Sequence, residues 1–390
     1  MKKTQGAIRG RPDFLLLILT LLLVGFGLVM VFSASSNIAV VSDNYNRDAF
    51  YFVKRQLLFA TAGTIVLFIL MNFHYEKFKK WFIFYFIGVV FLLAIVPFVG
   101  KEINGARSWL GFAGFGIQPT EFAKLAIILY LGRLISKKGE KFRDFKKGLV
   151  PVIIIVGFIC GLIMLQPDLG SCMILAMCAG IMIVAGGSNL KHLFFTGIAL
   201  SIIVALMVAV SLAADPDLVK WGYRIARFTS FMNPLDDMLG TGYHLSHSLF
   251  ALGHGGFTGA GFGHGVQKLH YLPYPYNDFI FAVIGEEFGF IGSLLFLVCY
   301  VAFIWRGLLV AMRCPDTYGT VVGSGIIGLI SIQAFINIGG VSGLMPITGV
   351  TLPFISYGGS SLLVSLASIG ILLSISRETN SKETANPRTR

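Results

Sequence analysis

The chain has 390 residues, of which 55% are hydrophobic and only 13% are charged, and its formal net charge is +12. An average soluble domain is about one quarter charged, so this chain lacks the polar surface of a single water-soluble globule. Its 35 Phe residues and long apolar runs also exclude intrinsic disorder. The composition therefore predicts an all-α polytopic membrane protein.

Ten apolar runs approach the length of about 20 residues that a helix needs to cross a bilayer. They cover residues 13–33, 53–73, 79–98, 119–136, 148–165, 171–187, 190–213, 279–304, 320–342 and 354–376. Most Lys and Arg then fall on the side of the two termini, above all in residues 133–147 and 377–390. The positive-inside rule places both termini in the cytoplasm, so the basic charge requires no nucleic acid partner.

We expect one transmembrane domain over residues 1–376, followed by a basic cytoplasmic tail over residues 377–390. A large extracytoplasmic loop, residues 214–278, joins the seventh and eighth helices, and connections of this length tend to be functional. We therefore expect function at the outer face. The five cysteines show no metal or redox spacing and are interpreted as small buried hydrophobic residues.

The first outer segment contains Arg107 and Trp109 and leads into Gln118-Pro-Thr-Glu-Phe-Ala-Lys. Glu121 and Lys124 are three residues apart and so share one helix face. Ionisable side chains at the edge of a bilayer usually face a bundle interior or a water-filled cavity. A cavity pair and a pair that only ties helices together fit this pattern equally well.

The short link between the fifth and sixth spans reads Gln166-Pro-Asp-Leu-Gly170. Because the fifth span returns to the side where the fourth begins, we expect Asp168 to approach Glu121, Lys124 and Arg107. The alternative is ordinary turn chemistry, since Pro-Asp-x-Gly is typical of turns.

Seven glycines lie in residues 253–265 of the long loop. Such glycines allow the backbone to approach a ligand or a neighbouring helix closely, and backbone amides that hold a phosphate are a weaker alternative. Five histidines fall in the same loop without the spacing of a metal site, so we interpret them as interfacial residues.

Asp278 ends the long loop at the start of the eighth span, where the helix dipole favours its ionised form. A carboxylate at the mouth of a membrane cavity fits a general base, and a simple helix N-cap is the alternative. Glu286 and Glu287 follow two turns deeper. We expect them to be structural and to pair with Lys54, Arg55 or Lys124.

Residues 346–361, Pro-Ile-Thr-Gly-Val-Thr-Leu-Pro-Phe-Ile-Ser-Tyr-Gly-Gly-Ser-Ser, join the last two spans on the outer side. Two prolines and the Gly-Gly-Ser-Ser end, which includes Ser360, indicate a broken or re-entrant segment. Irregular backbone at membrane depth is tolerated only where it is buried or lines a cavity. We expect this segment to form one wall of the outer pocket.

These motifs resemble, in order, those of the SEDS family (shape, elongation, division and sporulation), which includes FtsW, SpoVE and RodA. The similarity covers nearly the whole chain, and the Gly-Ala-Arg-Ser-Trp and Gly-Glu-Glu sequences are more similar to FtsW and SpoVE. The chain departs from the family at Asn277, where a Thr is usual.

The resemblance implies a ten-span glycosyltransferase of the bacterial cytoplasmic membrane that polymerises lipid II, the undecaprenyl-pyrophosphate-linked disaccharide peptide, into peptidoglycan. It implies a class B penicillin-binding protein as partner, together with divisome or spore-cortex proteins at the septum or forespore. It also implies Asp278 as the catalytic residue, with Arg107, Trp109, Glu121 and Lys124 in the substrate cavity. Asp168 and Ser360 complete our candidate substrate-binding set.

We expect Asp278 to deprotonate the acceptor sugar, and Arg107 and Lys124 to stabilise the leaving pyrophosphate. No organic cofactor is expected, whereas a Mg²⁺ or Mn²⁺ ion bridging Asp278 and the phosphates is an additional hypothesis. Two rival functions stay open at this point: a lipid II flippase, and a non-catalytic scaffold for a penicillin-binding protein.

Overall fold

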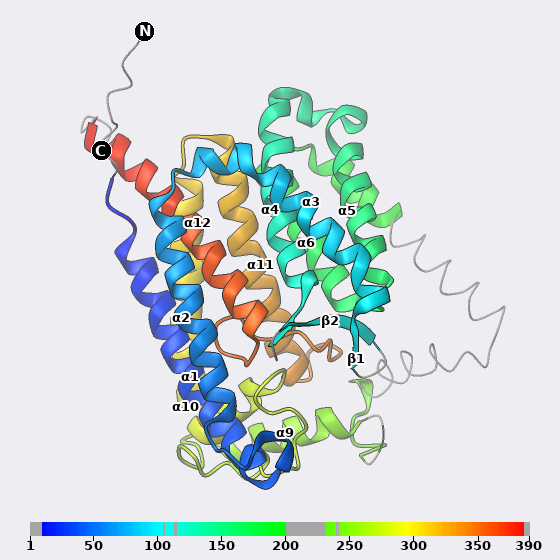
Figure 1. The fold of residues 1–390 in the computed structure, drawn as a ribbon, viewed down its shortest axis with the longest axis vertical. Helices are drawn as coiled ribbons and strands as arrows, with labels where there is room; N and C mark the ends of the chain where they lie inside the picture. The colour runs from blue at the N-terminus through cyan, green and yellow to red at the C-terminus, as the bar shows by residue number, and fades with distance from the viewer. Residues whose placement is uncertain are drawn as a thin grey trace, which may run out of the picture.

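The computed structural model of the chain describes residues 10–103, 106–112, 115–199, 231–238, 240 and 242–385. Helices dominate these residues, and they run side by side in a bundle (Figure 1). The start of the first helix and the end of the last lie at the same end of the bundle. The long helices are α1 (Phe14–Val41), α2 (Tyr51–Asn72), α3 (Tyr75–Val99), α4 (Pro119–Lys138), α5 (Val150–Met164), α6 (Leu169–Ala185), α9 (Tyr243–Gly255), α10 (Ile280–Met312), α11 (Thr317–Val341) and α12 (Gly359–Ala385).

Seven of the described helices are long and apolar enough to cross a membrane. They are α1, α2, α3, Phe145–Met164, α10, α11 and Gly359–Asn380, and α6 is a shorter apolar helix. The prediction of a helical multi-pass membrane protein is confirmed. Described helices cover nine of the expected spans, whereas residues 200–213 of the seventh lie outside the described residues.

A small sheet in the first outer segment departs from the all-helical expectation. Strands β1 (Lys101–Ile103), β2 (Ala106–Phe112) and β3 (Phe115–Ile117) form an antiparallel sheet in the order β1-β2-β3. The register pairs Glu102 with Arg107 and Gly111 with Gly116. The sequence Asn104-Gly105 between the first two strands is a typical hairpin signal, and it could have predicted the sheet.

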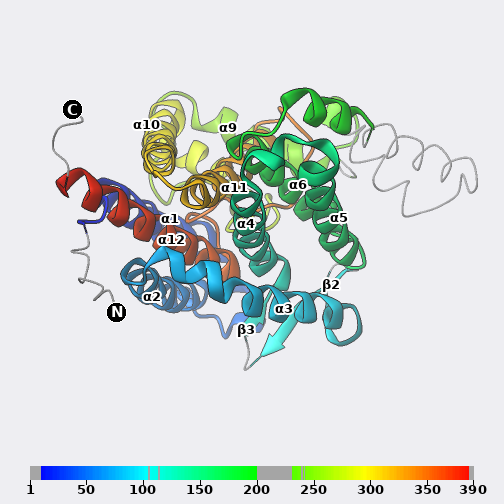
Figure 2. The ribbon, with the colours of Figure 1, turned by 90° about the horizontal axis from the view of Figure 1, so that it is seen from above.

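Helices α11 and α12 form the centre of the bundle. In their most apolar windows 78% and 83% of residues are buried, against 17–39% for the other five candidate spans. Figure 2 shows α11 between α10 and α4. Glycines of α11 allow this close packing: Gly325 faces Met182 and Ile128, and Gly328 faces Ile181.

Helix α10 is interrupted at Gly289, whose φ of +65° and ψ of −165° are not helical. The interruption exposes carbonyl groups that an unbroken helix would use internally. The amide of Ala260 donates to the carbonyl of Glu286 at 2.9 Å, and that of Gly261 donates to the carbonyl of Glu287 at 3.0 Å. The loop after α9 therefore completes the backbone hydrogen bonding of α10.

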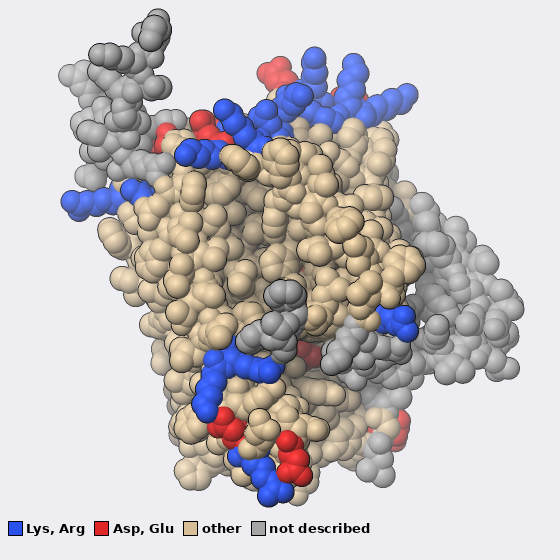
Figure 3. All heavy atoms as spheres, viewed as in Figure 1, with Lys and Arg blue, Asp and Glu red and all other residues tan. Residues whose placement is uncertain are grey.

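Charged side chains gather at the two ends of the bundle and leave an uncharged belt between them (Figure 3). Lys and Arg predominate at the end where the described chain begins and ends. Exposed basic residues at the start of α3 and in the segment after α4 lie there, including Lys77, Lys80, Lys141, Arg143, Lys146 and Lys147. We call this the basic end and the other the sheet end.

Candidate active site

An irregular segment between α11 and α12, residues 346–358, is the centre of the candidate site; we call it the connecting segment. The Gln56 side chain of α2 fixes it, because Gln56 Nε2 donates to the carbonyl of Ser356 at 3.1 Å and Gln56 Oε1 accepts from the amide of Gly358 at 3.2 Å. Gly27 of α1 leaves room for the Phe354 carbonyl. The predicted broken segment is thus present at the sheet end (Figure 1).

Asp278 lies beside the connecting segment. It precedes α10 in a turn, and the N-cap of α10 is Phe279, which makes no side-chain capping bond. The Asn337 amide of α11 donates to the carbonyl of Asp278 at 2.8 Å and to that of Val350 at 2.7 Å. A Cβ added at Gly349 would lie 3.6 Å from Asp278 Oδ2. The capping alternative is therefore not observed, and the carboxylate faces the connecting segment.

Asp168 lies at another edge of the same segment. It caps α6, since its Oδ1 accepts from the amide of Ser171 at 2.9 Å. A Cβ at Gly170 would lie 3.2 Å from the carbonyl oxygen of Thr348 and 3.7 Å from Asp168 Oδ1. Asp168 therefore has a local structural role as a helix cap, and its position also places this carboxylate next to the wall that Asp278 faces.

The start of α4 carries the predicted ion pair. Lys124 Nζ lies 2.7 Å from Glu121 Oε1, and the side chains are only 3% and 11% exposed. Ser360, at the start of α12, accepts from the amide of Gln118 at 3.1 Å and donates to the carbonyl of Gly116 at 3.4 Å. Ser360 thus ties the end of the connecting segment to the residues just before the ion pair.

The sheet contributes the remaining two candidates from β2. Trp109 packs over the adjacent strand, because a Cβ at Gly116 would lie 2.9 Å from its ring. Arg107 is exposed at the surface of the sheet. The structure therefore brings Asp278, Asp168 and Ser360 to one segment, and it connects the ion pair, Trp109 and Arg107 to that segment through the sheet and α4.

Glu286 and Glu287 have a structural role, as expected, but with different partners. Glu287 Oε1 lies 2.5 Å from Lys268 Nζ and accepts from Ser33 Oγ at 2.5 Å. The expected cations are engaged elsewhere: Lys54 pairs with Asp48 at 2.6 Å, and Lys124 pairs with Glu121. The predicted pairing was wrong because Lys268 reaches Glu287 from a loop. Helical periodicity in the sequence does not define the path of that loop.

Residues 256–268, which we call the glycine loop, are also held by Glu286. Its Oε1 accepts from the amide of Val266 at 2.7 Å and from that of Gln267 at 3.1 Å, and it lies 3.0 Å from His254 Nδ1. The glycines allow this close approach to α10, as one prediction proposed. Four backbone amides of the loop, at residues 260, 261, 266 and 267, donate to the carboxylate and carbonyls of α10.

The described residues contain no group of three or more His, Cys, Asp and Glu side chains arranged for a metal ion. His247 Nδ1 lies 2.9 Å from Gln267 Oε1, and His244 stacks on Phe279 with ring centroids 5.9 Å apart. These contacts fit the interpretation of the loop histidines as interfacial residues. A divalent ion at Asp278 would take most of its oxygen ligands from a substrate phosphate and water.

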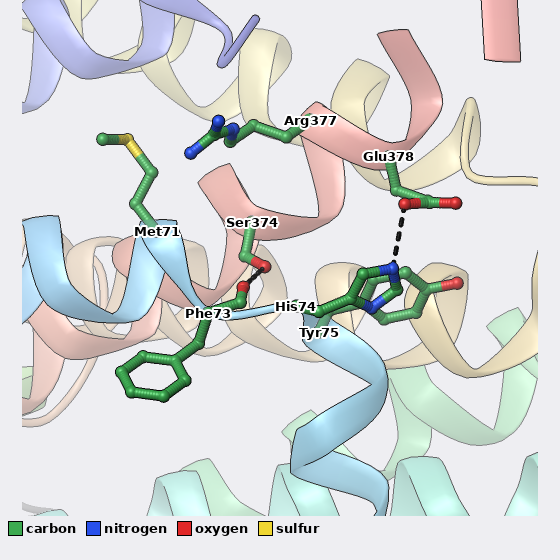
Figure 4. A pocket seen from close by; sticks show the side chains of 7 residues that line it. All are labelled: Met71, Phe73, His74, Tyr75, Ser374, Arg377 and Glu378. Carbon is green, nitrogen blue, oxygen red and sulfur yellow. Dashed lines mark hydrogen bonds and ion pairs between the residues drawn. The ribbon is translucent and has the colours of Figure 1, made fainter. Parts of the chain in front are cut away.

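A small hollow at the basic end lies away from this site (Figure 4). His74 Nε2 lies 3.1 Å from Glu378 Oε2, and Ser374 Oγ donates to the carbonyl of Phe73. Arg377 donates to Asn72 Oδ1 at 2.6 Å. These bonds fasten α12 to the α2–α3 turn. The hollow contains no candidate catalytic residue.

Residues 13–381 match the family model described as cell cycle protein, FtsW/RodA/SpoVE. The stage V sporulation protein E of Bacillus subtilis is 46% identical, covering 94% of this chain and 97% of that protein. The probable peptidoglycan glycosyltransferase FtsW of Trichlorobacter lovleyi is 39% identical, covering 93% of each chain.

Among solved structures, a chain of a peptidoglycan synthase complex that coordinates polymerization and crosslinking superposes with a TM-score of 0.77 at 27% identity, covering 94% of this chain and 98% of that one. The rod shape determining protein RodA of Thermus thermophilus gives a TM-score of 0.67 at 25% identity, with 94% and 97% coverage. The full-length match, the helical architecture and the site motifs agree: this chain belongs to the FtsW/RodA/SpoVE family.

Proposed function

We propose that this chain is a peptidoglycan glycosyltransferase that polymerises lipid II into glycan strands. The observation that carries the proposal is Asp278, a carboxylate outside any helix cap that faces an irregular wall at the sheet end of the bundle. Relatives named as peptidoglycan glycosyltransferases align over more than nine tenths of this chain and support the same reaction.

The active site faces the outside of the cytoplasmic membrane in this proposal. Ten helices cross the bilayer, and both termini are cytoplasmic. The uncharged belt and the predominance of Lys and Arg at the basic end support this orientation (Figure 3). The sheet, the connecting segment and the large loop between the seventh and eighth helices are then extracytoplasmic.

Asp278 acts as general base. It takes the proton from the 4-hydroxyl of the acceptor sugar while that oxygen attacks the anomeric carbon of the donor. The bond from the anomeric carbon to the undecaprenyl pyrophosphate breaks, and the configuration at this carbon inverts. Fixed cations in a water-excluded site stabilise such a leaving group best.

Arg107 and Lys124 supply the cations. Lys124 is buried against Glu121, so its position is fixed and part of its charge is neutralised. Arg107 is exposed on the sheet, where a phosphate can approach it. Trp109 offers an aromatic face to a sugar, and Asp168 and Ser360 contact the substrate from positions beside the connecting segment. A Mg²⁺ or Mn²⁺ ion held by Asp278 and the pyrophosphate would add further positive charge.

The proposed partner is a class B penicillin-binding protein that crosslinks the new strands. The solved neighbour belongs to a complex that coordinates polymerization and crosslinking, which supports a coupled pair here. Similarity to a sporulation protein and to FtsW supports action at the septum or forespore, together with divisome or spore-cortex proteins.

The test is polymerisation of lipid II by the purified chain with its co-expressed class B partner, with and without Mg²⁺. Asp278→Asn keeps the shape of the side chain and removes the base, so the rate should fall about 10²- to 10⁴-fold. Asp316→Asn is the matched control, because Asp316 binds Lys79 at 2.7 Å, at the basic end.

The rival functions predict other results. A flippase would move lipid II across a bilayer without lengthening glycan chains. A scaffold would support normal growth with Asp278→Asn. Equal polymer from wild type and a folded Asp278→Asn variant would remove Asp278 from the chemistry, and no polymer from a verified wild-type complex would reject the enzyme.

A further inference from the structure

Two cysteines meet across the hairpin of α5 and α6. Cys160 lies four residues before the end of α5, and Cys172 lies three residues after the start of α6. The Cys172 Sγ lies 3.4 Å from the carbonyl oxygen of Cys160, and the Cys160 Sγ lies 3.9 Å from that of Cys172. These reciprocal contacts bring both sulfur atoms and both backbones together.

The two thiols are more accessible than those of Cys178 and Cys314. Cys178 and Cys314 are 3% and 6% exposed, in agreement with the interpretation as small buried hydrophobic residues. Cys160 and Cys172 are only half-buried, so that interpretation does not hold for them. Their separation of 12 residues matches no redox motif, and only the folding of the hairpin makes them neighbours.

The place of the pair favours oxidation. The hairpin turn carries Asp168 and belongs to the sheet end, which is extracytoplasmic in the proposed orientation. Disulfides form and persist in oxidising compartments outside the cytoplasm. The pair lies within about one turn of that boundary, where a reagent in water can reach the outer end of the hairpin.

We propose that Cys160 and Cys172 are a modification site at which a disulfide closes the α5–α6 hairpin. The oxidant is an external disulfide, either of a thiol oxidoreductase or of a small molecule. One thiol loses its proton and its sulfur attacks the external disulfide, which forms a mixed disulfide and releases one external thiol. The second cysteine then attacks the bound sulfur, and the second external thiol leaves. Two protein thiols and one external disulfide thus give one protein disulfide and two external thiols.

Closure of this bond fixes the turn that holds Asp168. Gly170 lies against the Thr348 carbonyl of the connecting segment, so the bond also holds one edge of the candidate active site. The site of oxidation rests on the geometry of the hairpin alone. The expectation that it is oxidised outside the cell rests on the proposed orientation. The experiment below separates a failure of the disulfide site from a failure of the orientation.

The experiment treats the purified full chain in lipid nanodiscs with oxidised glutathione, blocks remaining thiols with an alkylating reagent, and identifies linked peptides by mass spectrometry. The expected product is a peptide pair joined between Cys160 and Cys172, with a loss of about two hydrogen masses relative to the dithiol. Cys160→Ser should abolish the linked pair. Cys299→Ser is the matched control, because Cys299 is also half-buried but lies on α10, and it should leave the pair intact.

Three outcomes would overturn the site: glutathione adducts on the separate cysteines without a linked pair, alkylation of both thiols under conditions that oxidise the unfolded chain, or linkage of wild-type Cys172 to a cysteine other than Cys160. A linked pair in nanodiscs that never forms in intact cells with an extracellular oxidant would leave the site in place and contradict the orientation. Polymerisation assays do not enter this test.

Discussion

The glycine loop and the connecting segment are two irregular segments at the same end of the bundle, but different chemistry holds them. Carboxylates fix the glycine loop: Glu286 binds the amides of Val266 and Gln267, and Glu287 binds Lys268 in a fully buried contact. Neutral amides and hydroxyls fix the connecting segment, through side chains such as Gln56, Asn337 and Ser360.

The difference separates structural carboxylates from candidate catalytic ones. Glu286 and Glu287 are buried and accept from several protein donors, so both carboxylates are engaged in holding the fold. Asp168 caps α6 beside the connecting segment, and the Asn337 amide holds the backbone of Asp278 against it. We infer that buried charges build the glycine loop, whereas polar side chains fix the connecting segment beside the candidate carboxylates Asp278 and Asp168.

The largest effect on stability should follow the loss of the cation in the glycine loop. Lys268→Met leaves the Glu287 carboxylate buried without its ion pair, which costs about 3–5 kcal/mol when one member of a buried pair is removed. Thermal unfolding in detergent, with its midpoint compared to wild type, measures the change.

Lys54→Met is the control for this prediction. Lys54 also pairs with a carboxylate, but its side chain is 68% exposed. The hydrogen bond from Lys54 keeps the pKa of Asp48 below its ordinary value. Because water screens this exposed pair, its loss should cost far less than that of the buried pair. Equal destabilisation by the two variants would contradict the distinction between buried and exposed charge.

Removal of the amide that joins Asp278 to the connecting segment should slow the reaction. Asn337→Ala leaves the carbonyls of Asp278 and Val350 without their donor and loosens the position of the base. A misplaced catalytic group costs up to about 100-fold in rate. We expect the polymerisation rate at saturating lipid II to fall about 10- to 100-fold, with a smaller change in KM, in initial-rate assays.

Gln333→Leu tests whether this loss is specific. Gln333 lies one turn earlier on α11, is 2% exposed, and its Nε2 has no hydrogen-bond partner among the described residues. It should therefore retain polymerisation. A comparable fall in both variants would assign the effect to packing of α11 and would remove Asn337 as a positioning residue.

Patterns within one element predicted much of this arrangement. The helices follow from apolar runs of spanning length, the Glu121–Lys124 pair follows from spacing by three residues, and the irregular wall follows from prolines and glycines. Contacts between elements were harder to predict from the sequence. The fold of a loop brings Lys268 to Glu287, and the hairpin of α5 and α6 brings Cys160 to Cys172. Neither contact follows from a periodic pattern in the sequence.

Strain in the connecting segment should have a smaller effect that depends on position. Gly349 has a φ of +75°, a conformation that costs other residues about 1–2 kcal/mol, and it lies beside Asp278. Gly349→Ala should therefore reduce polymerisation by up to about tenfold. Gly343→Ala introduces the same strain at a φ of +74°, next to Leu249 rather than Asp278. It should lower the unfolding temperature to a similar extent while polymerisation is retained. Loss of polymerisation in Gly343→Ala but not in Gly349→Ala would contradict the assignment of the connecting segment to the active site.

The smallest effect on stability and activity is expected at the basic end, where the charged residues contact neither the glycine loop nor the connecting segment. Glu378→Gln removes the contact with His74, whose side chain is 30% exposed, and a pair this accessible contributes about 1 kcal/mol or less. Thermal unfolding should therefore change little, and polymerisation should equal that of wild type, because the remaining bonds from Arg377 and Ser374 still fasten α12 to the α2–α3 turn. A large loss of polymerisation in a stable Glu378→Gln variant would mean that a shift of α12 at the basic end is transmitted along this buried helix to Ser360 at its other end. The candidate site would then depend on contacts at the basic end as well as on the glycine loop and the connecting segment.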